Sequence, residues 1–113
     1  MIVDQESPAD VARSLMARRR VRHALVLDDE RLHGVLSFRD VALEERIEDA
    51  TAGDLATTPA HSVPEGVSYR TAAERLTTHR IGCLPVVDDQ ERPTGWLTRS
   101  HIVDAWLHAH ATA

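Results

Sequence analysis

The segment VRHALVLDD at residues 21–29 returns in altered form as IGCLPVVDD at residues 81–89. Each copy is a short apolar run that ends in a pair of aspartates, and the copies lie sixty residues apart. The segments RLHGVLS at 31–37 and RPTGWLT at 92–98 come next, now with an offset of sixty-one. The chain therefore consists of two copies of one unit, with one residue added in the second turn.

In the first copy, the apolar spacing predicts a strand, a helix, a hairpin and a second helix. A short apolar start at residues 2–3 precedes a helix over about 8–20, which Ser7 and Asp10 are expected to open through a capping box. Strands at 23–27 and 32–36 follow as a hairpin. The second helix is opened by Ser37 and includes Val41, Ala42, Glu45 and Ile47.

The second copy repeats this order. Residues 61–63 are expected to pair as a strand, and Ser68 opens the following helix. Strands at 84–87 and 95–98 form the second hairpin, and a final helix runs over about 99–108. The predicted buried stripe of the first helix of this copy consists of Tyr69, Ala72, Ala73 and Leu76.

The predicted fold class is α/β (α+β), with two β-α-β-β-α repeats packed sheet to sheet with pseudo-twofold symmetry. Residues 1–48 form the first repeat, with a short N-terminus, and residues 61–113 form the second. Residues 49–60 are a connector that holds a short helical turn. Each half would bury too little surface to be stable alone, so we expect one compact module of 113 residues.

Composition excludes several classes of protein. A net charge of −5 argues against a nucleic-acid partner, which would require a basic face. No stretch approaches the roughly 20 apolar residues of a membrane span, and the N-terminus lacks a basic head followed by an apolar signal region. Cys83 is the single cysteine and lies in an apolar strand, which favours a buried structural thiol in a reducing compartment. We therefore expect a cytoplasmic protein.

The strongest candidate site is the segment GVLSFRD at residues 34–40. It places Ser37 at a helix start and Asp40 one turn further on. A carboxylate there can accept hydrogen bonds from both hydroxyls of a ribose, and a helix N-terminus attracts phosphate. The same two residues would also form a capping box in a helix that binds nothing, so both interpretations stay open.

Together with GVLSFRD, the helix ending in His79-Arg80 and the run that follows at residues 81–88 make the chain resemble a tandem pair of CBS domains, the regulatory modules named after cystathionine beta-synthase. The resemblance covers nearly the whole chain. It implies two clefts between the repeats, which in this family commonly bind AMP, ADP, ATP or S-adenosylmethionine and usually catalyse no reaction. The competing hypothesis is a structural or dimerisation module without a ligand.

The resemblance also implies which residues line each cleft. For the cleft that takes Asp40, the predicted ligand-binding residues are Val35, Ser37, Asp40, Ala60, His61, Ser62, Ile81, Gly82 and Cys83. In the other cleft His101 stands where the family has aspartate, and an imidazole cannot accept from both ribose hydroxyls. We expect that second cleft to be weaker, empty or changed in ligand. Its residues would be Val21, Arg22, His23, Thr98 and His101.

Neither a metal site nor a catalytic site is expected. His101 and His108 share a helix face but are too distant to hold one ion without a third element, and His110 lies in the tail. No nucleophile elbow or glycine-rich phosphate loop is present, and the paired aspartates are turn residues. We therefore predict no enzyme activity and no required cofactor, with an adenosine nucleotide as the ligand.

The helices that end the two repeats predict a homodimer. Trp106 and Leu107 are about 100° apart around a helix, so both cannot easily face one core. A twofold partner would cover such an apolar patch, and CBS pairs commonly associate through these helices. The alternative is that residues 49–60 fold over the patch. The apolar residues that offer this surface are Val41, Ile47, Ile102, Val103, Trp106 and Leu107.

Overall fold

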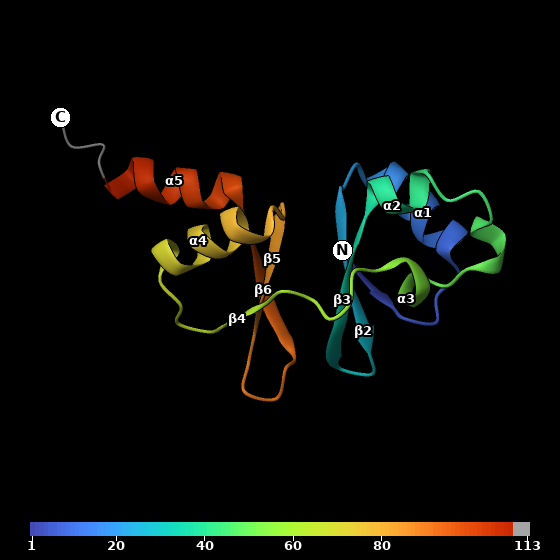
Figure 1. The fold of residues 1–113 in the computed structure, drawn as a ribbon, viewed down its shortest axis with the longest axis horizontal. Helices are drawn as coiled ribbons and strands as arrows, with labels where there is room; N and C mark the ends of the chain where they lie inside the picture. Colours follow the sequence, from blue (N-terminus) through green and yellow to red (C-terminus); the bar gives the residue numbers. More distant parts are fainter. Residues whose placement is uncertain (110–113) are drawn as a thin grey trace. The chain divides into compact units, whose positions relative to one another are not determined.

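The structure is a computed structural model that describes residues 1–109. It divides into two compact units, Met1–Ala60 and His61–Ala113, each with one three-stranded sheet (Figure 1). Both units have the order strand, helix, strand, strand, helix, which confirms the predicted fold class of mixed helices and strands in two repeats. Within residues 1–109 no helix is both long enough and apolar enough to cross a membrane.

The first unit packs its helices on one face of its sheet (Figure 1). In the strand order β1-β2-β3, β1 is parallel to β2 and β2 is antiparallel to β3. Its core contains Met16 and Leu36, both fully buried, and reaches as far as Ala52. The elements are β1 Ile2–Asp4, α1 Ala9–Arg19, β2 His23–Asp28, β3 Arg31–Ser37, α2 Phe38–Ala42, the 3₁₀ helix η1 Ile47–Asp49 and α3 Ala52–Leu55.

Residues 49–60 pack on the first unit. Ala52 is fully buried in its core, and the N–H of Gly53 donates to the carbonyl of Gln5 at 2.8 Å. A complete capping box opens α3, because the Thr51 and Asp54 side chains each accept from the other residue's N–H. The segment following the first repeat is therefore held by both apolar burial and backbone hydrogen bonds.

The second unit has the same plan. Its sheet order is β4-β5-β6, with β4 parallel to β5 and β5 antiparallel to β6. The Ser68 oxygen accepts from the Thr71 N–H at 3.1 Å, which confirms Ser68 as the cap of α4. The buried core is small and consists of Val63, Ala72, Leu76 and Leu84. The elements are β4 Val63–Pro64, α4 Tyr69–His79, β5 Cys83–Val87, β6 Pro93–Thr98 and α5 Arg99–Ala109.

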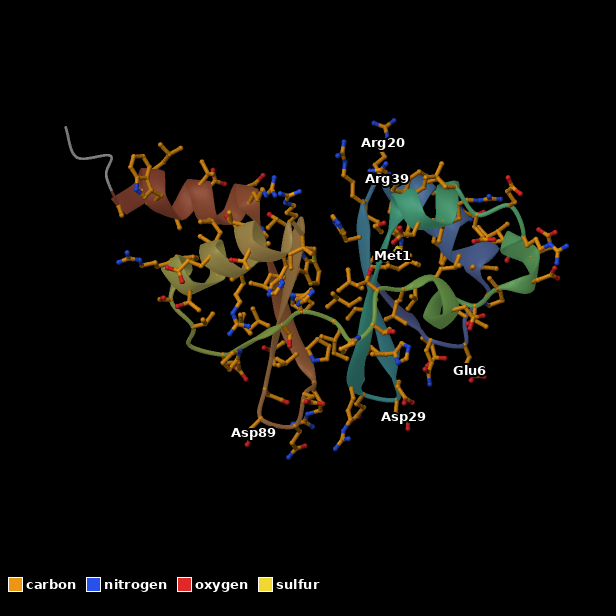
Figure 2. The ribbon with its side chains drawn as sticks, in the orientation of Figure 1. Met1, Glu6, Arg20, Asp29, Arg39 and Asp89 are labelled. Atoms are coloured by element: carbon orange, nitrogen blue, oxygen red, sulfur yellow. The ribbon has the colours of Figure 1, made fainter. Side chains whose placement is uncertain are left out.

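The two hairpin turns account for the change of offset between the repeats. Asp28 pairs with Arg31 in the first turn, whereas in the second turn the Asp88 carboxylate accepts from the N–H groups of Gln90 and Arg92, both at 2.9 Å. These hydrogen bonds lower the pKa of Asp88. Figure 2 shows Asp29 and Asp89 at the outer ends of the hairpins. The paired aspartates therefore build turns, as predicted.

Four local predictions are wrong. No side chain caps α1: the Ala9 N–H donates to the carbonyl of Ala50, so the capping box at Ser7 and Asp10 does not form. Tyr69 is exposed, because α4 buries only Ala72 and Leu76. The predicted strand at residues 61–63 is reduced to β4.

The fourth error concerns the helix that begins after Ser37. It ends at Ala42, and Ile47 starts the separate helix η1. On a continuous helix, positions 41 and 47 would lie about 120° apart. The break lets Val41 and Ile47 enter the same core, in which both are buried.

Candidate functional site

The first candidate site lies where β3 passes into α2. Ser37 ends β3 and caps α2, and its Oγ accepts from the Asp40 N–H at 3.2 Å. The N–H of Phe38 donates to the carbonyl of Arg22 at 2.8 Å, and His23 is the cross-strand partner of Ser37. The end of this sheet therefore gathers residues from both strands of the hairpin.

Asp40 contributes only half of a capping box. Its N–H donates to Ser37, but within residues 1–109 its carboxylate has no hydrogen-bond partner. In the complete box of α3, by contrast, the Asp54 carboxylate accepts from the Thr51 N–H at 2.9 Å. The Asp40 side chain is exposed and keeps the acceptor capacity of both oxygens. The capping-box interpretation thus explains Ser37 but not the carboxylate.

His23 stands beside Asp40, although the sequence assigned the two residues to different clefts. Burial lowers the pKa of His23, as does the adjacent charge of Arg22, while Asp40 acts in the opposite direction. The imidazole is therefore mainly neutral at pH 7, with one donor and one acceptor nitrogen. Figure 2 shows Arg20 and Arg39 at this same end of the unit, where they supply positive charge.

In the second unit, the position that corresponds to Asp40 is occupied by His101, whose side chain is already hydrogen-bonded within the helix cap. The Nδ1 atom of His101 accepts from the Thr98 N–H at 3.0 Å, and Thr98 Oγ1 accepts from the His101 N–H at 3.4 Å. A neutral imidazole has a single acceptor nitrogen, and here the cap uses it. Asp40 and His101 thus occupy equivalent positions but differ in the side-chain acceptor atoms that remain available to a ligand.

The remaining predicted residues of the second unit surround the start of β5. Ile81 donates to the Leu76 carbonyl at 3.1 Å directly after Arg80, which ends α4 in the left-handed conformation. Cys83 begins β5 opposite Thr98. Burial raises the pKa of the Cys83 thiol to about 11, so it stays protonated at neutral pH. The prediction that Cys83 is buried is confirmed.

Sequence reasoning missed a pair of stacked histidines. The ring of His61, which precedes β4, lies on the ring of His79 in the last turn of α4, with centroids 3.8 Å apart and planes 15° apart. No periodicity links these positions, because the stacking depends on how β4 returns beside β5. The contact holds His61 against the end of α4.

The predicted ligand-binding residues form two groups that the structure describes separately. Val35, Ser37 and Asp40 belong to the first unit, as does Ala60, its last residue. In Val35 the backbone N–H and C=O already bond to Thr57, so only its side chain is available to a ligand. The group in the second unit consists of His61, Ser62, Ile81, Gly82 and Cys83.

The histidines of α5 are the candidate metal ligands named above. Within residues 1–109 no group of three or more His, Cys, Asp or Glu side chains could hold a metal ion. His101 Nδ1 is engaged by the Thr98 N–H. His110 lies outside the described residues.

Comparison with known proteins agrees with this fold. The inosine-5'-monophosphate dehydrogenase of Thermoplasma acidophilum is 31% identical over 101 residues, which cover 89% of this chain but only 20% of that enzyme. The chain thus spans about a fifth of the relative's length. The crystal structure of the CBS-pair protein CBSX2 from Arabidopsis thaliana has a TM-score of 0.88 and 26% identity, and covers 100% of this chain and 89% of that one.

A second solved structure is CBSX2 in complex with AMP. It has a TM-score of 0.85 and 28% identity, and covers 97% of this chain and 89% of that one. The sequence profile of the CBS domain matches residues 1–45 and again residues 52–108. Two matches in tandem account for nearly all of the chain. The protein therefore belongs to the CBS domain family, as a tandem CBS pair.

Proposed function

We propose that this chain is a non-catalytic regulatory module that binds an adenosine nucleotide and signals its presence to a partner. The observation that carries the proposal is the unengaged Asp40 carboxylate at the start of α2. It can accept from both ribose hydroxyls, while the arginines at this end of the unit attract phosphate. CBSX2, which is 28% identical, is solved in complex with AMP.

The proposal assigns no catalytic residue. The dehydrogenase relatives match this chain over about a fifth of their own length, and the proposal does not carry their activity over to it. Cys83 is protonated and buried, which removes the one thiol as a nucleophile. The following residues of the second unit remain predicted ligand contacts, to be tested by single substitutions: His61, Ser62, Ile81, Gly82 and Cys83.

A thermal-shift screen with AMP, ADP, ATP, NAD and S-adenosylmethionine tests the proposal. A ligand that binds only the native state raises the stability by about 2.7 kcal/mol at a hundred times its Kd. We expect at least one of the five to raise the melting temperature. No rise at millimolar concentration would favour the competing hypothesis of a structural or dimerisation module.

The outer surface of α5 supports a second part of the proposal, a homodimer. Val103, Trp106 and Leu107 are 53%, 58% and 52% exposed, a concentration of apolar surface that favours burial against a partner. The first repeat offers less apolar surface than predicted, because Val41 and Ile47 are buried. Residues 49–60, the alternative cover for the patch, pack on the first unit instead and leave the three α5 side chains exposed.

Sedimentation at micromolar concentration should therefore give about twice the monomer mass of 12.6 kDa. Trp106→Glu should split the dimer, because a carboxylate would have to be desolvated inside an apolar interface. His108→Glu on another face of α5 is the matched control and should leave the mass unchanged. A wild-type mass of one chain would refute the dimer.

A further inference from the structure

The segment that leaves the first repeat is attached to its sheet by a short strand-like contact (Figure 1). The Val35 N–H donates to the Thr57 carbonyl at 3.2 Å, and the Thr57 N–H donates to the Val35 carbonyl at 2.9 Å. The bridge is antiparallel, so residues 56–58 continue the sheet beyond β3. We call residues 56–60 the strap. The strap and β3 belong to the same compact unit.

The strap is held firmly at its start and weakly after that. Ala52, in the helix just before it, is fully buried in the first core, and Leu55 and Ala56 pack against that core. The side chains of residues 57–59 are exposed. Among the residues that the structure describes, no hydrogen bond attaches residues 58–60 to the sheet. A segment with exposed side chains and only two backbone hydrogen bonds opens locally at low cost.

Gly34 provides the room that the closed strap needs. A Cβ atom at this position would lie 2.6 Å from the Thr57 carbonyl oxygen and 2.7 Å from Thr58 Cγ2. Cβ atoms do not approach a backbone oxygen so closely, so a side chain here would push the strap away from β3. The closed strap therefore requires glycine at position 34, and a substitution there opens it.

The strap pairs with β3 within the candidate nucleotide site. Val35 holds the strap through its backbone, while its side chain is a predicted ligand contact. Ala60, the last residue of the strap, is another predicted contact. A nucleotide that contacts Val35, Ala60 and Asp40 meets all three together only while the strap lies on β3. Because a ligand shifts an equilibrium by its differential affinity for the two states, such a nucleotide favours the closed strap.

We propose that the strap is a conformational device that closes on β3 when the nucleotide binds. The inference rests on the proposed function and names the segment that responds to the ligand. The strap is directly followed by His61, whose ring lies on the ring of His79 in α4 with centroids 3.8 Å apart. Only residues 58–60 separate the bridge on β3 from this contact with the second repeat. A change in the strap is therefore passed along a short stretch of chain.

Nucleotide binding and strap closure are reciprocal. If the nucleotide binds only the closed state, the apparent affinity is the intrinsic affinity multiplied by the fraction of molecules with a closed strap. A substitution that opens the strap then weakens binding by the same factor. Thr57→Pro is such a substitution, because it removes the N–H that donates to Val35 and leaves β3 and α2 unchanged. Ala56 already has the extended conformation that proline requires before it, with φ −70° and ψ 149°.

Hydrogen exchange of the ¹⁵N-labelled chain with and without millimolar AMP tests the proposal. The amides of Val35 and Thr57 report the opening of the strap, because each donates across the bridge. We expect AMP to slow both by a factor of one plus the ratio of free AMP to its Kd, which isothermal titration measures. The N–H of Gln90, bonded to the Asp88 side chain in the second hairpin turn, is the internal control and should not change.

Two substitutions open the strap by different routes. Gly34→Ala pushes it away from β3, and Thr57→Pro removes its donor. We expect each to weaken AMP binding by the factor by which it lowers the closed fraction, measured without nucleotide from exchange at the Val35 amide. Thr57→Ala is the matched control, because it keeps the N–H and changes only an exposed side chain. It should bind AMP as the wild type does.

The proposal is overturned if AMP binds and leaves the exchange of the Val35 and Thr57 amides unchanged. It is equally overturned if Thr57→Pro binds AMP as tightly as Thr57→Ala. Absence of any binding heat with AMP would overturn the proposed binding of this nucleotide and the role of the strap with it. Binding without strap protection contradicts only the strap, so the two failures are distinguishable.

Discussion

Gly34→Ala is expected to lower the free energy of unfolding by about 1–3 kcal/mol, the usual cost of overpacking a close contact. The new methyl group would lie 2.6 Å from the Thr57 oxygen and force residues 56–58 away from β3. Such a shift weakens two backbone hydrogen bonds and the packing of α3. Urea unfolding followed by circular dichroism would measure the change in midpoint at constant slope.

Gly95→Ala is the matched control. The same substitution at the equivalent position meets open space, and neither glycine has a positive φ that alanine would resist. We expect the stability to stay constant or to rise slightly, because alanine restricts the unfolded chain more than glycine does. Equal destabilisation by both substitutions would show that glycine matters in this hairpin for a reason other than the approach of a strand.

Asp40→Ala is expected to weaken nucleotide binding tenfold or more. Loss of two hydrogen bonds between a carboxylate and the ribose hydroxyls costs about 1.5–3 kcal/mol. Isothermal titration with the nucleotide that gives the largest thermal shift would measure this change. His101→Ala should alter the affinity little, because His101 already uses its acceptor nitrogen on Thr98.

The melting temperature of the Asp40→Ala chain separates binding from capping. The hydrogen bond to Ser37 comes from the backbone N–H of residue 40 and survives the substitution. The stability should therefore stay close to that of the wild type. A fall in stability as large as the loss in affinity would restore the capping-box interpretation, and equal loss of affinity in the two variants would refute unequal sites.

Much of the candidate site could be predicted because its determinants lie within a few residues of each other. Ser37 and Ser68 cap the helices that follow them, and each interaction spans three residues. The repeat itself predicts that Thr98 and His101 occupy the positions of Ser37 and Asp40. Comparison of the two repeats therefore identified these equivalent positions, although it could not show which of their polar atoms already form hydrogen bonds.

The sequence by itself determined the repeat, the order of elements and the caps of α2 and α4, since hydrophobic spacing and short-range hydrogen bonds depend on neighbouring residues. Only the tertiary structure decided the features that depend on distant segments. Ala50 replaces the predicted cap of α1, and Thr57 engages the backbone of Val35. Gly34 and Gly95 match in sequence but differ in surroundings, because a covering strand reaches one edge and not the other.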